Sequence, residues 1–248
     1  MIDFHTHILP SIDDGAKTVE NSLFLLDAVS KLGMSQVVLS PHYYPSQERI
    51  SEFVSRRNES CRALAEAIKI NRENGIRFPQ LHVAAEVYLE QIIFNNNDLT
   101  PLTLDSKGKF MLTELIYEDE LTHSTESMVR QLVYSYNIVP ILAHIDRYPF
   151  LMKEKNLLRL LDMGCVAQMN VSSLLGFFKR KKMLKYIEKG YIGVIGTDIH
   201  NKTYIPRIKE GFSYLREDDL EYITNISRGI LKKSKKDSSN ESSDIVAD

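Results

Sequence analysis

The sequence is poor in cysteine, since its 248 residues include only Cys61 and Cys165. Two cysteines in a chain of this length do not make a disulfide framework, and both are expected to be small buried hydrophobic residues. Neither begins a Cys-x5-Arg loop, because the sixth residue after Cys61 is Ala67 and the sixth after Cys165 is Val171. If the protein cleaves phosphate esters, it does so without a thiolate.

Long apolar runs and an excess of positive charge are also missing. No run reaches the roughly 20 apolar residues that a helix needs to cross a bilayer. An Asp and two His soon after Met1 do not fit a signal peptide. The 31 basic and 33 acidic residues give a formal net charge of −2, which does not favour broad binding to nucleic acid. We therefore expect a cytoplasmic protein without membrane insertion; whether it forms a homo-oligomer stays open.

Seven short apolar runs predict strands, with helical patterns between most of them. The strands are expected over residues 1–4, 35–39, 82–86, 110–114, 138–143, 165–170 and 191–197. Thr18 as an N-cap and Gly33 as a stop delimit a first helix. Further helices are expected over 50–74, 124–136, 153–163, 178–189, 205–215 and 219–227. The alternation implies parallel strands with right-handed crossovers, in a closed or nearly closed barrel or, alternatively, an open doubly wound sheet.

Histidines and carboxylates stand where these apolar runs stop. His5 and His7 are two positions apart, so in a strand they point to the same face and can hold one ion together. In a barrel of parallel strands, the loops after the carboxyl ends of the strands build the site. We therefore expect nine side chains to meet at one mouth: His5, His7, Asp14, His42, Glu86, Glu114, His144, Asp198 and His200.

This set of donors has the composition of a site for divalent ions. Histidine with carboxylate, and no cysteine, favours Mn, Fe, Zn or Mg. Bridging carboxylates could hold two ions about 3.5–4 Å apart, as in metallophosphatases, and supply hydroxide near neutral pH. Arg147 and Arg207 follow His144 and His200, and a guanidinium matches phosphate oxygens. The pattern predicts phosphoester hydrolysis, with a surface ion pair as the alternative role for either arginine.

Other segments have simpler interpretations. The basic run Lys179–Lys182 is expected to be a solvated helix start, with attraction of an acidic partner as the alternative. Phe177 and Phe178 are expected to be part of the core, with lining of the mouth as the alternative. Asn170, at the end of a predicted strand, could bond substrate or satisfy the core. Residues 232–248 are polar and almost without large apolar residues, so we expect a disordered tail after a single domain over residues 1–231.

Several motifs together resemble those of the PHP (polymerase and histidinol phosphatase) superfamily, over residue 1 to roughly residue 230. They are Phe4-His-Thr-His7, Ser40-Pro-His42, Ala85-Glu86, Ala143-His144 and Thr197-Asp-Ile-His200. More narrowly, the chain resembles the branch of bacterial manganese-dependent protein tyrosine phosphatases. That resemblance is carried by Ser11-Ile-Asp-Asp-Gly-Ala16, Ala143-His-Ile-Asp-Arg-Tyr148 and Thr197-Asp-Ile-His-Asn201. Thr6 and Thr197 depart mildly from it, since serine is frequent at both positions.

The resemblance implies a distorted (β/α)7 barrel similar to a TIM barrel, with outer helices. It implies that the nine donors hold a trinuclear centre, with Mn²⁺ as the expected ion, and that Arg147 and Arg207 hold the substrate phosphate. These two arginines and Asp198 are the expected catalytic residues. The expected substrate is a phosphorylated tyrosine kinase, with a tyrosine-rich tail, that governs capsule or exopolysaccharide synthesis.

Three functions are compatible with these residues. The first is a phosphotyrosine protein phosphatase, in which a metal-bound hydroxide attacks phosphorus in line. The second is a histidinol-phosphate phosphatase; the Asp-Asp-Gly loop and the His-Ile-Asp-Arg-Tyr segment favour the first over it. The third is a metal-dependent regulator that binds a kinase without hydrolysis. Missing donors would favour this function, but the set of nine donors is complete.

Overall fold

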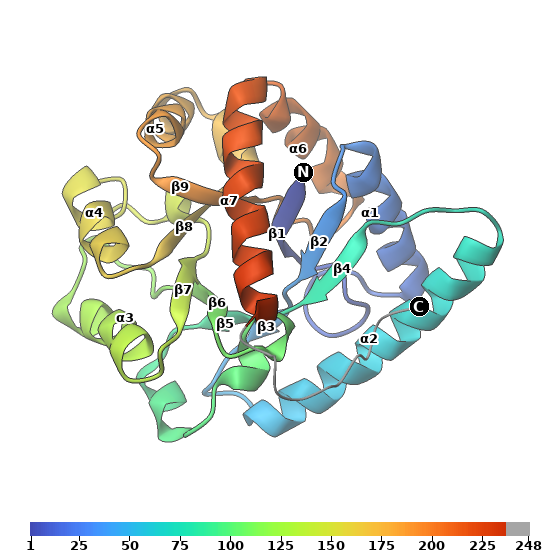
Figure 1. Cartoon of the computed structure of the whole chain (residues 1–248), viewed down its shortest axis with the longest axis horizontal. Coiled ribbons are helices and arrows are strands. Elements are labelled where there is room, and N and C mark those ends of the chain that lie inside the picture. Colours follow the sequence, from blue (N-terminus) through green and yellow to red (C-terminus); the bar gives the residue numbers. More distant parts are fainter. Residues whose placement is uncertain (237–248) are drawn as a thin grey trace.

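The computed structural model describes residues 1–236, and its strands form two parallel sheets that together make a distorted barrel (Figure 1). One sheet has the order β1-β2-β4 and the other has the order β3-β5-β6-β7-β8-β9. The strands are β1 (Ile2–Thr6), β2 (Gln36–Leu39), β3 (His42–Tyr43), β4 (Gln80–Val83), β5 (Glu86–Tyr88), β6 (Phe110–Glu114), β7 (Val139–Leu142), β8 (Val166–Asn170) and β9 (Ile192–Gly196). Every ladder between these strands is parallel, as expected.

The two sheets are joined where the chain passes from one to the other. β2 is followed after Ser40 and Pro41 by β3, and β4 is followed after Ala84 and Ala85 by β5. The predicted strand over 82–86 is therefore two strands with a break between them. On the other side, Thr6 forms an isolated parallel bridge with Ile199, so the first and last strands meet and the barrel nearly closes. The prediction of a distorted barrel is confirmed.

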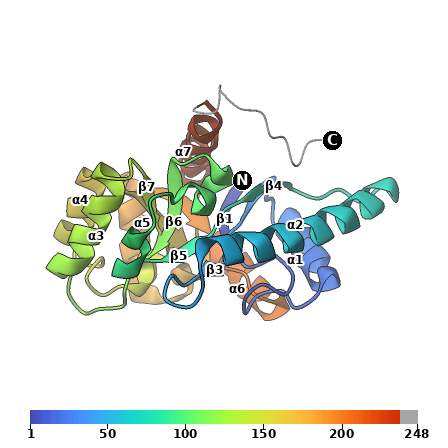
Figure 2. The ribbon, with the colours of Figure 1, turned by 90° about the horizontal axis from the view of Figure 1, so that it is seen from below.

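Seven helices of the described residues surround the strands: α1 (Val19–Lys31), α2 (Ile50–Glu73), α3 (His123–Tyr134), α4 (Glu154–Asp162), α5 (Phe177–Glu188), α6 (Ile205–Phe212) and α7 (Glu217–Lys236). α1 begins as expected, because the Thr18 side chain accepts a hydrogen bond from the Asn21 N–H. In Figures 1 and 2, α1 and α2 lie on one side of the barrel and α3 and α4 on the other. Short 3-10 turns, within residues 91–106, replace a helix between β5 and β6.

The strands are buried on both faces. Val37 and Leu142 pack in a large cluster that includes apolar side chains of the outer helices. Their sequence neighbours Val38 and Ile141 pack in a second cluster, with residues of β1, β6 and β9. This division explains why the strand sequences are apolar without a two-residue alternation.

Helix α7 extends well beyond the expected range of 219–227. Ile230 and Leu231 are buried in the second cluster, and the Ser234 hydroxyl donates to the Leu104 carbonyl at 3.2 Å. These contacts explain why the helix continues through residues 232–236, which the sequence placed in a disordered tail. The rest of that predicted tail, residues 237–248, lies outside the described residues. Within residues 1–236, no helix has the length and apolarity needed to cross a membrane.

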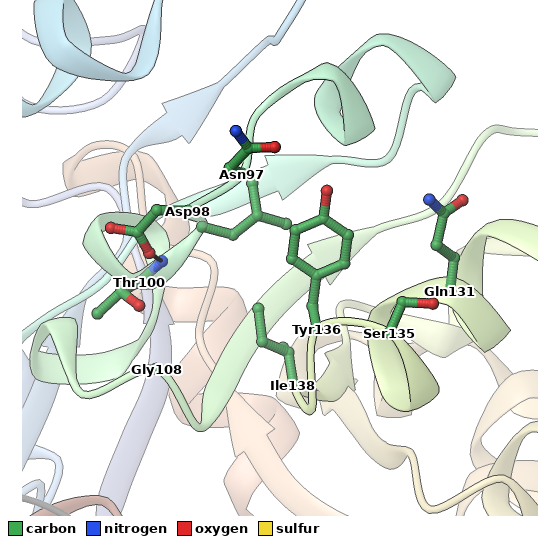
Figure 3. A pocket seen from close by; sticks show the side chains of 9 residues that line it. Asn97, Asp98, Thr100, Gly108, Gln131, Ser135, Tyr136 and Ile138 are labelled. Atoms are coloured by element: carbon green, nitrogen blue, oxygen red, sulfur yellow. Dashed lines mark hydrogen bonds between the residues drawn. The ribbon is translucent and has the colours of Figure 1, made fainter.

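A cavity of about 470 Å³ lies at the amino ends of β6 and β7 (Figure 3). Gly108 and Ile138, which precede these two strands, line it together with Tyr136. The Tyr136 hydroxyl already donates to the Asn96 carbonyl at 2.7 Å, and the Asp98 carboxylate accepts from the Thr100 N–H at 2.8 Å. Because Glu114 and His144 lie at the opposite ends of these two strands, this cavity is separate from the cluster of predicted donors.

Candidate metal centre

The two histidines at the end of β1 form the base of the site. Both are fully buried, and their Nε2 atoms lie 3.1 Å apart. His5 Nδ1 lies 3.2 Å from Gln168 Oε1, and His7 Nδ1 lies 2.8 Å from Asp13 Oδ2. Each imidazole is therefore held by its outer nitrogen while its inner nitrogen faces the centre, the arrangement by which supporting residues orient metal-binding histidines.

Glu86, at the start of β5, is the carboxylate around which the imidazoles gather. Its Oε2 lies 2.9 Å from His42 Nδ1, 3.0 Å from His5 Nε2 and 3.3 Å from His7 Nε2. Its Oε1 lies 2.9 Å from His144 Nε2. Although Oε2 is buried, it makes no hydrogen bond of good geometry. Buried polar atoms are rarely left without a partner, so this convergence of lone pairs fits a shared cation.

Asp198 follows β9 and extends the centre on the β1 side. Its Oδ1 lies 3.3 Å from His7 Nε2, 3.5 Å from His5 Nε2 and 3.6 Å from His200 Nδ1. The Asp198 backbone N–H also donates to the His5 carbonyl at 2.8 Å. The meeting of the first and last strands thus places these four side chains together.

Asp14 and Glu114 lie at the outer edge of the same group. Asp14 Oδ1 is 3.3 Å from His200 Nε2 and 3.6 Å from His42 Nε2. Glu114 Oε1 is 3.5 Å from His144 Nε2. Asp14 is exposed, whereas the histidines that it faces are largely covered. The centre is therefore open toward solvent on the side of the Asp14 loop.

The structure brings all nine predicted donors into one contiguous cluster. Within it, three overlapping groups have donor atoms within 4.8 Å of one another: His7, Asp14, His42 and His200; His5, His7 and Glu86; and His42, Glu86 and Glu114. His144 and Asp198 join them through the contacts given above. Imidazoles mixed with carboxylates suit Mn, Fe, Zn or Mg, and three overlapping groups offer more donors than one ion uses.

Two glycines are required by the close approach of backbone at this site. A Cβ on Gly15 would lie 2.0 Å from the His7 carbonyl oxygen. A Cβ on Gly196 would lie 2.5 Å from the His5 Cβ. Neither position accommodates a side chain unless the ligand-bearing backbone shifts.

Two donors also have unusual backbone conformations. His144 and Asp198 adopt the left-handed region, with φ of 32° and 54°. Such conformations cost about 1–3 kcal/mol for residues with a side chain and persist where the surrounding structure imposes them. The packing around the centre therefore holds these two side chains in place against a local preference.

The charges of the cluster change the protonation of its members. Burial alone would raise the pKa of Glu86, but His5, His144 and His42 outweigh it and hold that pKa well below its usual value. Burial alone would lower the pKa of His5, but the Glu86 and Asp198 carboxylates leave it raised. At Glu114, burial and the Glu86 charge both raise the pKa. The centre therefore favours an ionised Glu86 among groups that compensate its charge.

The two predicted phosphate-binding arginines line one cavity of about 340 Å³ beside the donors. Arg147 pairs with Asp198 Oδ2, and the Asn170 amide donates to the same oxygen at 2.9 Å. Arg207 reaches the cavity from α6 and is exposed. One carboxylate, Asp198, thus links the donor cluster to this cavity.

Sequence reasoning missed three residues that hold the donors in place. Asp13 accepts from the His42 N–H at 3.1 Å as well as contacting His7. Gln168 Oε1 accepts from the His144 N–H at 2.6 Å. Asp3 accepts from the Thr197 hydroxyl at 2.6 Å, and burial raises its pKa to about 6. The sequence signal that could have indicated two of these supporting residues is their position next to predicted donors. Asp3 stands two residues before His5, and Asp13 stands beside Asp14.

The structure corrects the expectation for the aromatic pair at the start of α5. Phe177 and Phe178 are 66% and 85% exposed, so they do not belong to the core. Their rings meet edge to face, 5.4 Å between centroids. They precede Lys179, which lines the 340 Å³ cavity.

Comparison with known proteins gives consistent matches along the chain. The family described as "Capsular polysaccharide synthesis, CpsB/CapC" matches residues 1–230. The tyrosine-protein phosphatase CpsB of Streptococcus agalactiae is 27% identical over 212 residues, covering 81% of this chain and 83% of that protein. The putative tyrosine-protein phosphatase CapC of Staphylococcus aureus is 28% identical over 213 residues, covering 83% and 79%. The tyrosine-protein phosphatase YwqE of Bacillus subtilis is 26% identical over 210 residues, covering 81% and 78%.

A solved structure shares the fold. It comes from work on YwqE from Bacillus subtilis and CpsB from Streptococcus pneumoniae, described as unique metal-dependent tyrosine phosphatases. The TM-score is 0.68 at 19% sequence identity, with 92% of this chain and 93% of that chain covered. The architecture described above is therefore that of a known α/β fold.

Proposed function

This chain belongs to the CpsB/CapC family of capsular polysaccharide synthesis, and from that premise we propose that it is a metal-dependent protein-tyrosine phosphatase. Three relatives with 26–28% identity are named as tyrosine-protein phosphatases, one of them putatively. The observation that carries the proposal is the cluster of nine donors directly beside a cavity lined by two arginines. A phosphate ester bound by the two arginines would lie next to divalent ions held by the donors.

The proposed ligands are the nine donors that the sequence singled out: His5, His7, Asp14, His42, Glu86, Glu114, His144, Asp198 and His200. We propose two or three divalent ions, with Mn²⁺ as the first candidate and Fe, Zn and Mg as alternatives. The unpartnered Glu86 Oε2 among three imidazole nitrogens supports this assignment. When bound in such a site, divalent ions lower the pKa of coordinated water and neutralise phosphate oxygens.

The chain's own catalytic residues are Arg147, Arg207 and Asp198. Both arginines line the cavity, so their guanidinium groups bind the phosphate oxygens and stabilise the charge that develops during transfer. Asp198 orients Arg147 through Oδ2 while its Oδ1 faces the imidazoles. A tyrosine side chain leaves with a pKa of about 10, so its departure needs less proton donation than that of an aliphatic alcohol.

The proposed substrate is a protein rather than a small metabolite. The family is described by its part in capsular polysaccharide synthesis. We propose that the substrate is a phosphorylated tyrosine kinase of capsule or exopolysaccharide synthesis, with its phosphotyrosines in an accessible tail. The openness of the donor cluster beside the exposed Asp14 is compatible with a polymeric substrate.

Phosphate release from matched substrates tests the proposal. The Mn²⁺-loaded full chain should hydrolyse a phosphotyrosine peptide faster than the corresponding phosphoserine peptide or histidinol phosphate. His42→Ala should lose bound metal and activity together, because His42 contacts both Glu86 and Asp14. The control His123→Ala changes an exposed histidine at the start of α3 and should have no effect. No release with Mn, Fe, Zn or Mg, or a preference for histidinol phosphate, would contradict the proposal.

A further inference from the structure

The cavity beside the metal centre extends beyond the two arginines to the start of α5. Ser173, Gly176 and Lys179 all line it. Ser173 lies in the turn after β8, and Gly176 is the residue from which α5 begins. This outer part of the cavity is therefore built by a segment that contributes none of the nine donors.

Lys179 supplies a positive charge that is in no ion pair with a described carboxylate. Burial raises the pKa of Asp146 in the same cavity, and Lys179 is one of the charges that oppose this rise from a longer distance. Its neighbours in the basic run are already engaged: Arg180 lies over the Tyr214 ring at 4.0 Å, and Lys182 lies over the Tyr186 ring at 5.0 Å. Lys179 is exposed, lines the cavity and forms no ion pair within residues 1–234. Of the four basic residues 179–182, it is the one that lines the cavity.

Ser173 supplies a hydroxyl without a partner. The residue is 7% exposed and its Oγ is buried, yet that oxygen makes no hydrogen bond with any described residue. A buried hydroxyl without a partner is unfavourable by about 1–3 kcal/mol. Because Ser173 lines the cavity, a ligand there could accept its hydrogen bond.

The start of α5 adds a third feature of the same kind. No side chain caps this helix at Gly176, so the N–H groups of its first turn lack a side-chain acceptor. The amino end of a helix attracts negative charge. Asp146, a carboxylate that also lines the cavity, has its Oδ1 occupied by the Asn170 N–H at 3.0 Å.

We propose that Lys179, Ser173 and the amino end of α5 form a second anionic subsite, which binds a negatively charged side chain adjacent to the phosphotyrosine in the peptide substrate. The inference rests on the proposed phosphatase function and adds a preference for the substrate sequence. The bound group is a carboxylate of Asp or Glu or a second phosphotyrosine phosphate, since both are anions that accept hydrogen bonds. Arg147 and Arg207 remain with the phosphate that is hydrolysed.

Peptides that differ in a single residue test this subsite. The test compares kcat/KM for phosphotyrosine peptides that carry Glu, Gln or a second phosphotyrosine beside the target residue. For the doubly phosphorylated peptide, kcat/KM is measured for release of the first phosphate. For the wild-type chain, the Glu peptide should exceed the Gln peptide by about fivefold, the upper end of the range for an exposed ion pair. Lys179→Ala should bring this ratio close to one, and Lys179→Glu should reverse it. Lys181→Ala, an exposed neighbour that does not line the cavity, is the control and should keep the ratio.

Ser173→Ala separates a ligand-binding hydroxyl from a structural one. It should lower the preference for the anionic peptide by about threefold without lowering the thermal stability, because the hydroxyl has no partner in the free protein. An equal loss for all three peptides in Lys179→Ala, or an unchanged ratio, would overturn the subsite while leaving the phosphatase function intact. If the wild-type chain hydrolyses none of the peptides, the proposed function itself fails. The Glu and phosphotyrosine arms identify which anion the subsite prefers.

Discussion

Glu86→Gln should remove most of the stabilisation that divalent ions give to the folded protein. The substitution keeps the size of the side chain but removes the negative charge from the atom that lies 2.9–3.3 Å from three imidazole nitrogens. A ligand at a hundred times its Kd stabilises the folded state by about 2.7 kcal/mol. For a chain of this size, that corresponds to an increase in Tm of about 5–11 °C.

The variant should respond much less. If loss of the carboxylate weakens binding by about a hundredfold, the upper value measured for residues that only support a metal ligand, the same ion concentration gives about 0.4 kcal/mol. The increase in Tm then falls to about 1 °C. Thermal unfolding of each protein before and after addition of Mn²⁺ measures this increase in Tm. Because each protein is compared with its own metal-free form, any effect of the substitution on the metal-free protein cancels.

Glu66→Gln is the matched control, since Glu66 is exposed on α2 and is not one of the nine donors. It should show the full wild-type increase in Tm. A full increase in Glu86→Gln, or no increase in the wild-type chain with Mn, Fe, Zn or Mg, would refute the assignment of Glu86 as a shared ligand.

Three further outcomes follow from the geometry. Arg147→Ala should retain its metal, measured by elemental analysis, but lose about 30-fold in kcat/KM for a phosphotyrosine peptide, the scale of a charge-assisted hydrogen bond; unchanged kinetics would contradict its role. Gly15→Ala should lose the increase in Tm with Mn²⁺, because the new Cβ would lie 2.0 Å from the His7 carbonyl oxygen; a normal increase would show that the loop adapts. Iodoacetamide at pH 7 should leave activity unchanged, because burial raises the pKa of Cys61 to about 11 and that of Cys165 to about 12. Reactive thiolate is therefore scarce. Rapid inactivation that is prevented by replacing both cysteines with Ser would contradict this prediction.

The parallel pairing of the strands and the ends at which the donors lie were predictable from the sequence, whereas the choice between a barrel and an open doubly wound sheet was not. Apolar runs that stop at His5, Glu114 or His144 specify both a strand and the side chain at its carboxyl end. Parallel connection then brings these ends to one face whatever the detailed register. The donor cluster follows from this topology, so its composition could be anticipated without coordinates.

The breaks in the strands were not predictable in the same way. Ala84-Ala85 looks like part of one apolar run over 82–86, and the short strand that follows Ser40-Pro41 was not expected. At both places the chain leaves one sheet and enters the other. Such a change of direction depends on how neighbouring strands pack, which local composition does not record. The supporting residues Asp13 and Gln168 were missed for a similar reason, because their partners lie far away in the sequence or across the barrel.

The ends of α5 and α7 show the limit of reasoning from residue type. Phe177 and Phe178 have core composition, but they lie at the exposed start of a helix. Ser234 has the composition of a polar tail, but it is buried against the Leu104 carbonyl. In both cases the tertiary position of the helix decides burial, whereas hydropathy alone gives the opposite result.

The bridge between Thr6 and Ile199 has a consequence for how the protein is made and kept intact. His5 and His7 stand on one side of this junction, and Asp198 and His200 stand on the other. The group of His7, Asp14, His42 and His200 is therefore complete only after nearly the whole barrel has been synthesised. An ion held by this group would resist separation of the two ends of the barrel, so proteases that depend on that separation should act more slowly on the protein when Mn²⁺ is added.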